Sequence, residues 1–120
     1  MLTTFPNLTR AQITTAPKSL LKDYYKSDKI HELGQPTITY LANKCHVSTG
    51  YLSDLLKKET GKTAKDHIND FLVEKAKDLL IGSDNSISGI AYTLGYNYPH
   101  YFSRIFKTKT GMTPQEYRDN

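Results

Sequence analysis

One pattern of three short segments occurs twice in this chain, about fifty residues apart. The first copy comprises Ile38–Ala42, Tyr51–Lys57 and Thr60–Gly61, and the second comprises Ile87–Ala91, Tyr101–Lys107 and Thr110–Gly111. Ala42 and Ala91 are 49 residues apart, whereas Gly61 and Gly111 are 50 apart. The second copy therefore has one extra residue between its helical segments, and the fold must accommodate two similar helix pairs.

Apolar residues recur at intervals of three and four, which is the period of an amphipathic helix, and no segment alternates with period two. Capping residues and glycines mark where the helices begin and end. The expected helices run from Leu20 to about Leu33, from Ile38 after the cap Thr37, from Thr49 after the cap Ser48, over about 64–81 after the cap Thr63, from Ile87 to Leu94 after the cap Ser86, from about Tyr98 to Thr110, and over a last short segment after Thr113. The sequence therefore predicts an all-α fold of about seven helices.

The domain organisation follows from these segments. Residues 1–17 are rich in Thr and lack periodicity, so they are predicted to be a flexible leader, and residues 18–120 to be one domain. Within it, a first helix-turn-helix lies at about 37–61 and a second at about 86–111. The linker helix between them, at about 64–81, would be about 27 Å long.

Each repeated unit has the features of a helix-turn-helix, in which the second helix enters the major groove of DNA. Ala42 and Ala91 allow the two helices of each unit to cross closely, and Leu52 and Phe102 are expected to fill the space above them. The outward faces of the second helices then carry Thr49, Gly50, Ser53, Asp54 and Lys57 in one unit, and Tyr98, Pro99, His100, Ser103, Arg104 and Lys107 in the other.

Arg104 is the clearest candidate for reading a base, because its planar fork can donate to O6 and N7 of guanine. Lys107, three residues further along, is better placed for a phosphate. Asp54 occupies in the first unit the place of Arg104 in the second. It can accept a hydrogen bond from N4 of cytosine, or it can pair with Lys57 or Lys58 at helical spacing.

The charge pattern agrees with an anionic partner. The net charge is +4, and no Asp or Glu occurs between Asn85 and Gln115, where Arg104, Lys107 and Lys109 lie. Cys45 is the only cysteine, which excludes an internal disulfide and fits a reducing cytoplasm; it is expected in the core. The sequence shows no signal peptide, membrane span, metal-ligand spacing or catalytic set, so we expect no cofactor, metal site or enzyme activity.

The second unit resembles the signature of the AraC/XylS family of bacterial transcription regulators. The resemblance is carried by Ile87–Tyr96, Tyr101–Lys107 and Thr110–Arg118, with Tyr51–Gly61 similar to the matching part of the first unit. It covers about residues 18–119 and implies two helix-turn-helix subdomains, joined by a linker helix, that place their recognition helices in successive major grooves. It also implies base contacts from Gly50, Ser53, Asp54, His100, Ser103 and Arg104. Gly50 and Asp54 depart from the larger or basic residues often found in the family.

The expected function is therefore sequence-specific binding of double-stranded DNA to regulate transcription. Backbone contacts are expected from Thr49, Lys57, Tyr98 and Lys107, and the family implies activation through RNA polymerase. The chain is expected to act in the cytoplasm as a monomer and to be the DNA-binding end of a longer regulator rather than a stand-alone one. The alternative is a helical protein-interaction module with weak DNA affinity.

Overall fold

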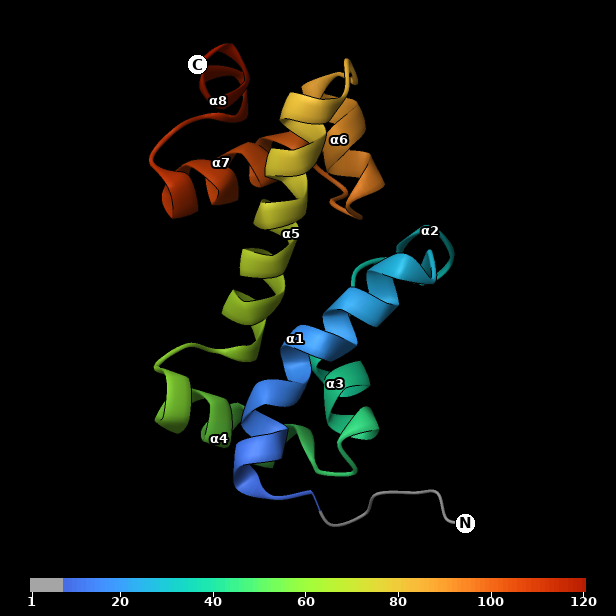
Figure 1. Cartoon of the computed structure of the whole chain (residues 1–120), viewed down its shortest axis with the longest axis vertical. Coiled ribbons are helices and arrows are strands. Elements are labelled where there is room, and N and C mark those ends of the chain that lie inside the picture. The colour runs from blue at the N-terminus through green and yellow to red at the C-terminus, as the bar shows by residue number, and fades with distance from the viewer. Residues whose placement is uncertain (1–7) are drawn as a thin grey trace. The chain divides into compact units, whose positions relative to one another are not determined.

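A computed structural model describes residues 8–120, which form eight α-helices and no strand (Figure 1). The helices are α1 (Arg10–Lys26), α2 (Lys29–Leu33), α3 (Ile38–Lys44), α4 (Thr49–Thr60), α5 (Ala64–Gly82), α6 (Ile87–Thr93), α7 (Pro99–Thr110) and α8 (Pro114–Asp119). The all-α prediction is confirmed. None of these helices has both the length and the apolar composition that crossing a membrane requires.

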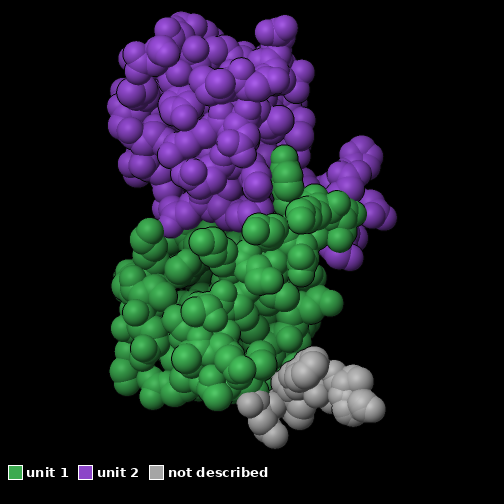
Figure 2. Space-filling view, in the orientation of Figure 1, with its two compact units in different colours: residues 1–27, 36–68 green, residues 28–35, 69–120 purple. Residues whose placement is uncertain are grey.

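The chain folds into two compact units, shown in different colours in Figure 2. Unit 1 contains the described residues up to Ser27 together with Pro36–Ile68, and unit 2 contains Asp28–Gln35 together with Asn69–Asn120. The chain thus leaves unit 1 for α2, returns to it for α3 and α4, and passes into unit 2 within α5.

The predicted leader is wrong for residues 10–17, which form the first two turns of α1. Thr9 caps this helix: its hydroxyl accepts from the backbone N–H of Gln12, and the Gln12 side chain accepts from the backbone N–H of Thr9. Ile13, Pro17, Leu21 and Tyr24 are buried at intervals of three and four along one side. Pro17 conceals this stripe in the sequence because proline is unusual inside a helix. Residues 1–7, also assigned to the leader, lie outside the described residues.

The single helix expected over residues 20–33 is two helices in the structure. α1 ends at Ser27, and Asp28 adopts a left-handed conformation with φ of 59° before α2 begins. A short polar side chain tolerates this conformation, so the chain turns at Asp28 and enters unit 2. This break accounts for eight helices among the described residues instead of about seven.

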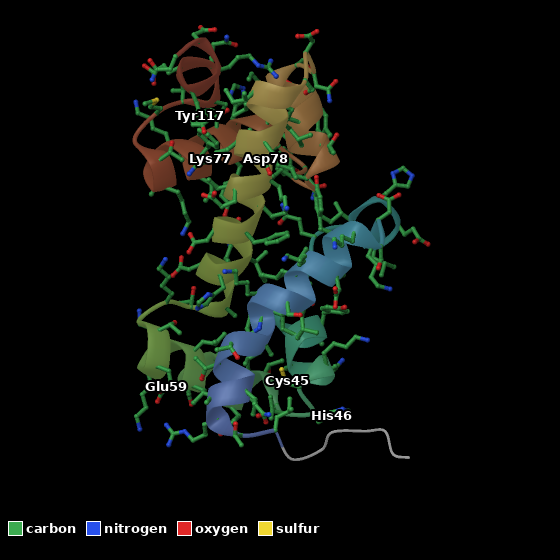
Figure 3. The ribbon with its side chains drawn as sticks, viewed as in Figure 1. Cys45, His46, Glu59, Lys77, Asp78 and Tyr117 are labelled. Atoms are coloured by element: carbon green, nitrogen blue, oxygen red, sulfur yellow. The ribbon has the colours of Figure 1, made fainter. Side chains whose placement is uncertain are left out.

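Unit 1 is built from α1, which packs against α3 and α4 (Figure 1). Leu41, Leu52 and Leu56 are completely buried between them. Cys45 is 1% exposed and its thiol pKa is raised by burial, so it is a core residue, as expected (Figure 3).

Unit 2 is built around α7, which packs against α6 and α8. Phe102 and Phe106 are fully buried. The rings of Phe106 and Tyr117 of α8 meet edge to face, with their centroids 5.5 Å apart. The Arg118 guanidinium donates to the carbonyl oxygens of Leu80 (2.9 Å) and Ser83 (3.2 Å), so it satisfies backbone groups at the C-terminal end of α5.

The two helix pairs repeat each other in backbone detail. The N–H of Val47 donates to the carbonyl of Ala42, and the N–H of Tyr96 donates to that of Ala91, both at 3.0 Å. Between these partners the chain adopts a left-handed conformation, with φ of 59° at His46 and 83° at Gly95. The four residues 45–48 link α3 to α4 and the five residues 94–98 link α6 to α7, which confirms the extra residue.

The predicted helix caps are also confirmed. Hydroxyl groups at the N-caps accept from backbone N–H groups three residues ahead at Thr37, Ser48, Thr63, Ser86 and Thr113. Thr63 and Thr113 both form capping boxes, with Asp66 and Glu116 respectively. The repeat therefore continues beyond Gly61 and Gly111 into α5 and α8, the helices that follow the two helix pairs.

Candidate nucleic-acid interface

The outward face of α4 in unit 1 carries the residues that the sequence predicts to meet DNA. Thr49, Gly50 and Asp54 are exposed, Ser53 is half-buried, and Lys57 is exposed near the end of the helix. The opposite face carries the buried side chains of Leu52, Leu55 and Leu56. Because the apolar side fixes how α4 rotates about its axis, the polar side faces solvent.

The outward face of α7 in unit 2 has the same pattern. His100 and Arg104 are exposed and Ser103 is half-buried, in the same order as Gly50, Asp54 and Ser53. Tyr98, which precedes the helix and caps it without a side-chain hydrogen bond, is 73% exposed, and Lys107 is exposed one turn beyond Ser103. The structure therefore brings each predicted set together on one helix face within its own unit.

The two faces differ in charge. α7 contains Arg104, Lys107 and Lys109 and no acidic residue, but the Lys109 ammonium lies 2.7 Å from the Asp70 carboxylate of α5. This pairing, which the sequence did not indicate, removes Lys109 from the set of free cations. Within residues 8–120, Arg104 has no ion pair.

Asp54 on α4 also has no ion pair among the described residues. Of the two lysines that could have paired with it, Lys57 instead donates to the carbonyl of Gly61 at 3.4 Å. The structure thus does not contain the Asp54–lysine pair that was the structural alternative for this residue, and the Asp54 carboxylate faces solvent beside Ser53.

A hollow of about 260 Å³ adjoins Asp54 in unit 1, and we call it the α4 hollow. It is lined by Arg10, Tyr51, Asp54, Leu55 and Lys58. Arg10 reaches it from the first turn of α1 and also pairs with Glu59 of α4 at 3.0 Å. Arg10 is not among the residues predicted to meet DNA, because the sequence predicts a leader for this segment; the Thr9-x-x-Gln12 capping pattern is the signal that could have revealed the helix.

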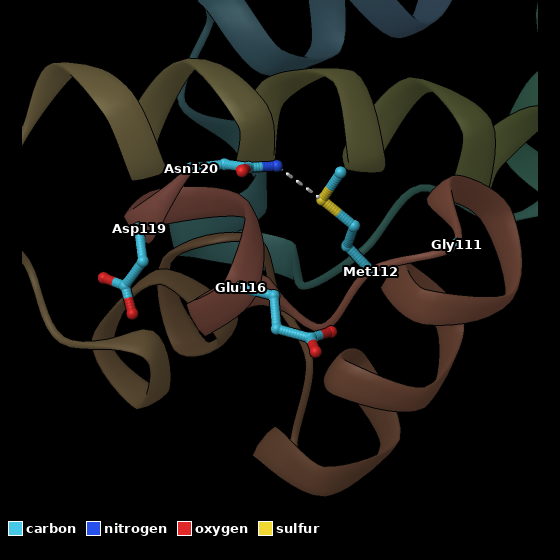
Figure 4. Close-up of a pocket in the computed structure, with 5 residues that line it drawn as sticks. All are labelled: Gly111, Met112, Glu116, Asp119 and Asn120. Carbon is cyan, nitrogen blue, oxygen red and sulfur yellow. Dashed lines mark hydrogen bonds between the residues drawn. The ribbon is translucent and has the colours of Figure 1, made fainter.

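A second hollow, of about 450 Å³, lies in unit 2 and is lined by Gly111, Met112, Glu116, Asp119 and Asn120 (Figure 4). The Asn120 amide donates to the Met112 sulfur at 3.4 Å. Glu116 accepts from the backbone N–H of Thr113. Hydrogen bonds with the backbone and the side chain of Thr113 lower the pKa of the Glu116 carboxyl. With two carboxylates in its lining, this hollow is unsuited to a phosphate.

Two other histidines, His46 and His67, have local roles. His46 lies in the turn between α3 and α4 (Figure 3), and the His67 ring is 3.0 Å from the Thr60 hydroxyl. Among the residues that the structure describes, no three His, Cys, Asp or Glu side chains are grouped so that they could hold a metal ion.

Several known proteins resemble this chain in sequence or in fold. A family model described as a helix-turn-helix domain matches residues 41–120. An uncharacterized HTH-type transcriptional regulator, YobQ of Bacillus subtilis, is 34% identical over 74% of this chain and 37% of its own length. The HTH-type transcriptional activator RhaR of Yersinia pseudotuberculosis is 36% identical over 65% of this chain and 28% of its own length.

Among solved structures, the C-terminal domain of AraT, a response regulator from Geobacillus stearothermophilus, superimposes with a TM-score of 0.72 at 29% identity. The superposition covers 89% of this chain and 84% of that one. The chain thus spans well under half of the two curated relatives and most of this isolated domain.

The fold, the two repeated helix pairs and these matches define a DNA-binding helix-turn-helix domain of the kind found in transcription regulators. This chain contains two such helix pairs. It belongs to the AraC-type family of helix-turn-helix regulators.

Proposed function

We propose that this chain binds double-stranded DNA in a sequence-specific manner and thereby regulates transcription, with α4 and α7 entering successive major grooves. The observation that carries the proposal is the matched exposure of the two helices. Each follows a turn with the same backbone hydrogen bond, and each turns an exposed, polar face outward over a buried apolar one. Such a face at the N-terminal part of a recognition helix is the part that contacts base edges.

In this proposal Arg104 reads guanine, and His100 and Ser103 contact neighbouring base edges. In unit 1 the proposed base contacts are Gly50, Ser53 and Asp54. The exposed carboxylate of Asp54 suits the N4 amino group of cytosine, which is the hydrogen-bond donor of that base in the major groove. Because Gly50 offers no side chain, we expect unit 1 to discriminate among bases less strongly than unit 2.

Contacts to the sugar-phosphate backbone would come from Thr49 and Lys57 in unit 1 and from Tyr98 and Lys107 in unit 2. Such contacts position a protein on the duplex and carry no sequence information directly. The exposed hydroxyl of Tyr98 and the exposed ammonium of Lys107 lie at the two ends of the base-reading face of α7. They therefore suit phosphates on either side of the bases read by Arg104.

We propose no enzyme activity for this chain. Its proposed role is in the cytoplasm. It would act there as a monomer, because each chain carries two reading helices. Contact with RNA polymerase is the further partner that the family relationship suggests. The second candidate function, protein interaction with weak DNA affinity, is favoured by Asp54, because an unpaired carboxylate on a recognition helix repels phosphates.

Selection of bound duplexes from a random pool tests the proposal. We expect an enriched site with two groove-length elements, one of them containing a guanine that Arg104 reads, and an affinity that falls steeply as salt rises. Enrichment of no sequence, together with a binding signal that salt does not weaken, would favour the protein-interaction function.

A further inference from the structure

We infer that Arg10, Tyr51 and Lys58, around the α4 hollow, form an additional binding site for a phosphodiester group of duplex DNA. The inference rests on the proposed function and extends it to a residue outside both helix-turn-helix segments. It assigns a DNA contact to the N-terminal turn of α1, which precedes the first of these segments in the chain.

The position of the hollow supports this site. Tyr51, Asp54 and Lys58 are three and four residues apart, so they share one side of α4. That side borders the outward face on which Asp54 is proposed to read a base. A helix in the major groove, which is about 12 Å wide, is flanked by the two phosphate backbones. Side chains bordering the base-reading face therefore face phosphates.

The chemistry of the lining also fits. The hollow brings together a guanidinium, an ammonium and a phenol hydroxyl, all of which can donate to a phosphate oxygen. The lining also contains one carboxylate, that of Asp54, so two positive charges oppose one negative charge and the lining keeps a net positive charge. Tyr51 is 44% exposed and the Arg10 side chain 58% exposed, so these groups are accessible. The volume of about 260 Å³ is several times the roughly 30 Å³ that one water occupies in the liquid.

The ion pair with Glu59 leaves Arg10 free to bind a second anion. Only the Nη2 atom of Arg10 bonds to the Glu59 carboxylate, and a guanidinium has five N–H donors. Both partners are well exposed, so the pair contributes little free energy of its own. Its effect is to hold the guanidinium beside α4, within the lining of the hollow (Glu59 is labelled in Figure 3).

Charge balance gives Arg10 its importance for unit 1. Along α4, Asp54 and Glu59 oppose Lys57 and Lys58, so the helix has no net charge. α7 has three cations and no acidic residue, with Lys109 paired to Asp70. Without Arg10, α4 would therefore contribute no net positive charge toward a phosphate. Arg10 supplies the positive charge that Asp54 and Glu59 cancel on α4.

The test uses a mixed-sequence 30-base-pair duplex and measures its dissociation constant at several NaCl concentrations. Arg10→Gln keeps a hydrogen-bond donor for Glu59 but removes the charge. We expect it to weaken binding roughly five- to tenfold at 0.1 M NaCl and to reduce the salt slope by about one unit. Lys58→Gln should act in the same direction, and Arg10→Lys should retain most of the slope.

The control is Lys22→Gln, which removes one exposed positive charge from α1 at 12 residues from Arg10, about 18 Å along the helix axis. It should lower the slope far less. If Arg10→Gln and Lys22→Gln change the slope equally, the inference is wrong.

Glu59→Gln separates a DNA contact from a purely structural ion pair. It breaks the pair while keeping Arg10, so affinity should stay the same or rise, and the double variant Arg10→Gln/Glu59→Gln should still lack one unit of slope. Recovery of the full slope in the double variant would show that unpaired Glu59, not loss of a contact, caused the defect. Absence of salt-dependent binding by the unaltered chain would instead contradict the proposed function itself.

Discussion

The side-chain amide of Gln35 donates a hydrogen bond to the backbone carbonyl of Leu94 at 3.1 Å, across 59 residues of sequence. Leu94 is the C-cap of α6, where the backbone carbonyls lack partners within the helix. Gln35 follows α2, and both belong to unit 2 although they precede the first helix-turn-helix. A segment that precedes the first helix-turn-helix in the sequence therefore completes the turn of the second.

Gly95→Ala should destabilise unit 2 by about 1–3 kcal/mol. Gly95 has φ of 83°, which costs an L-residue about 1–2 kcal/mol. An added Cβ would also lie 2.7 Å from Cγ of Gln35 and 3.2 Å from its backbone nitrogen. Urea unfolding of the variant and the parent measures the difference, provided that the free energy of unfolding depends on urea concentration with the same slope in both. Unchanged stability would contradict the packing of Gln35 against this turn.

His46→Gly is the matched change in unit 1. His46 has a φ of 59° in the equivalent turn and is exposed. Glycine removes the left-handed strain of about 1–2 kcal/mol and loses about 0.5–1 kcal/mol through its greater freedom in the unfolded chain. We expect a gain in the free energy of unfolding of about 0–1.5 kcal/mol. A clear loss would show that the imidazole makes a stabilising contact.

Tyr96→Phe should lower the free energy of unfolding by about 1–3 kcal/mol. The Tyr96 hydroxyl donates to Oδ1 of Asn69 at 2.7 Å, and the two side chains are 3% and 6% exposed. Burial raises the pKa of Tyr96 far above its usual range, so the hydroxyl stays protonated and remains a donor. The variant leaves a buried acceptor without its partner.

The double variant Asn69→Leu/Tyr96→Phe separates this hydrogen bond from packing. Replacing both polar partners leaves no unsatisfied acceptor, so the double variant should be less destabilised than the sum of the two single ones. Simple additivity in urea unfolding would mean that the two side chains do not interact energetically.

Arg104→Ala should weaken binding to the selected DNA site by about 1–3 kcal/mol and relax one base position. The exposed, unpaired guanidinium on α7 is the physical reason. Titration against the site and against each single-base variant measures both effects. A variant that kept the parent's affinity and base preference would show that Arg104 does not read a base.

Lys107→Ala should instead weaken binding to all duplexes alike and lower the salt slope by about one unit. Lys107 is exposed, and it contributes to lowering the pKa of Glu116, so its charge acts locally on the surface of unit 2. A change confined to one base position would assign it to base reading.

Stability should fall in acid partly through Glu116. Hydrogen bonds from Thr113 lower the pKa of this carboxyl below its ordinary value of 4.5. A lowered folded pKa means that the ionised group stabilises the fold above about pH 4.5, and that this contribution is lost as pH falls through the lowered value. Glu116→Gln should lack this part of the pH dependence, which melting temperatures between pH 3 and 7 would measure.

The outward faces of the recognition helices followed correctly from the sequence because they depend on local signals. The N-caps Ser48 and Thr63 act through hydrogen bonds to backbone N–H groups three residues ahead. The periodicity of Leu52, Leu55 and Leu56 fixes which side of α4 is buried. The repeat itself located both turns. Such features depend on residues within about one helical turn of each other, so a sequence displays them directly.

The first half of α1 did not follow from the sequence. Pro17 and the surrounding Thr residues obscured its apolar stripe, which becomes a helix face because α3 and α4 bury it. With that helix misassigned, no pattern could place Arg10 beside Asp54. The pairing of Lys109 with Asp70 was equally invisible, because two residues 39 positions apart meet only when α7 packs near α5.

The amino-acid sequence by itself determined that this chain is all-helical, that it contains two equivalent helix pairs, and which side of each recognition helix is polar. These properties arise from periodicity and capping, which act over a few residues. Only the tertiary structure decided that the chain passes between its two units at Asp28 and again at Pro36 before α5, and which charges remain unpaired around α4 and α7. Those outcomes depend on contacts between distant segments, which form only once the buried surfaces have packed together.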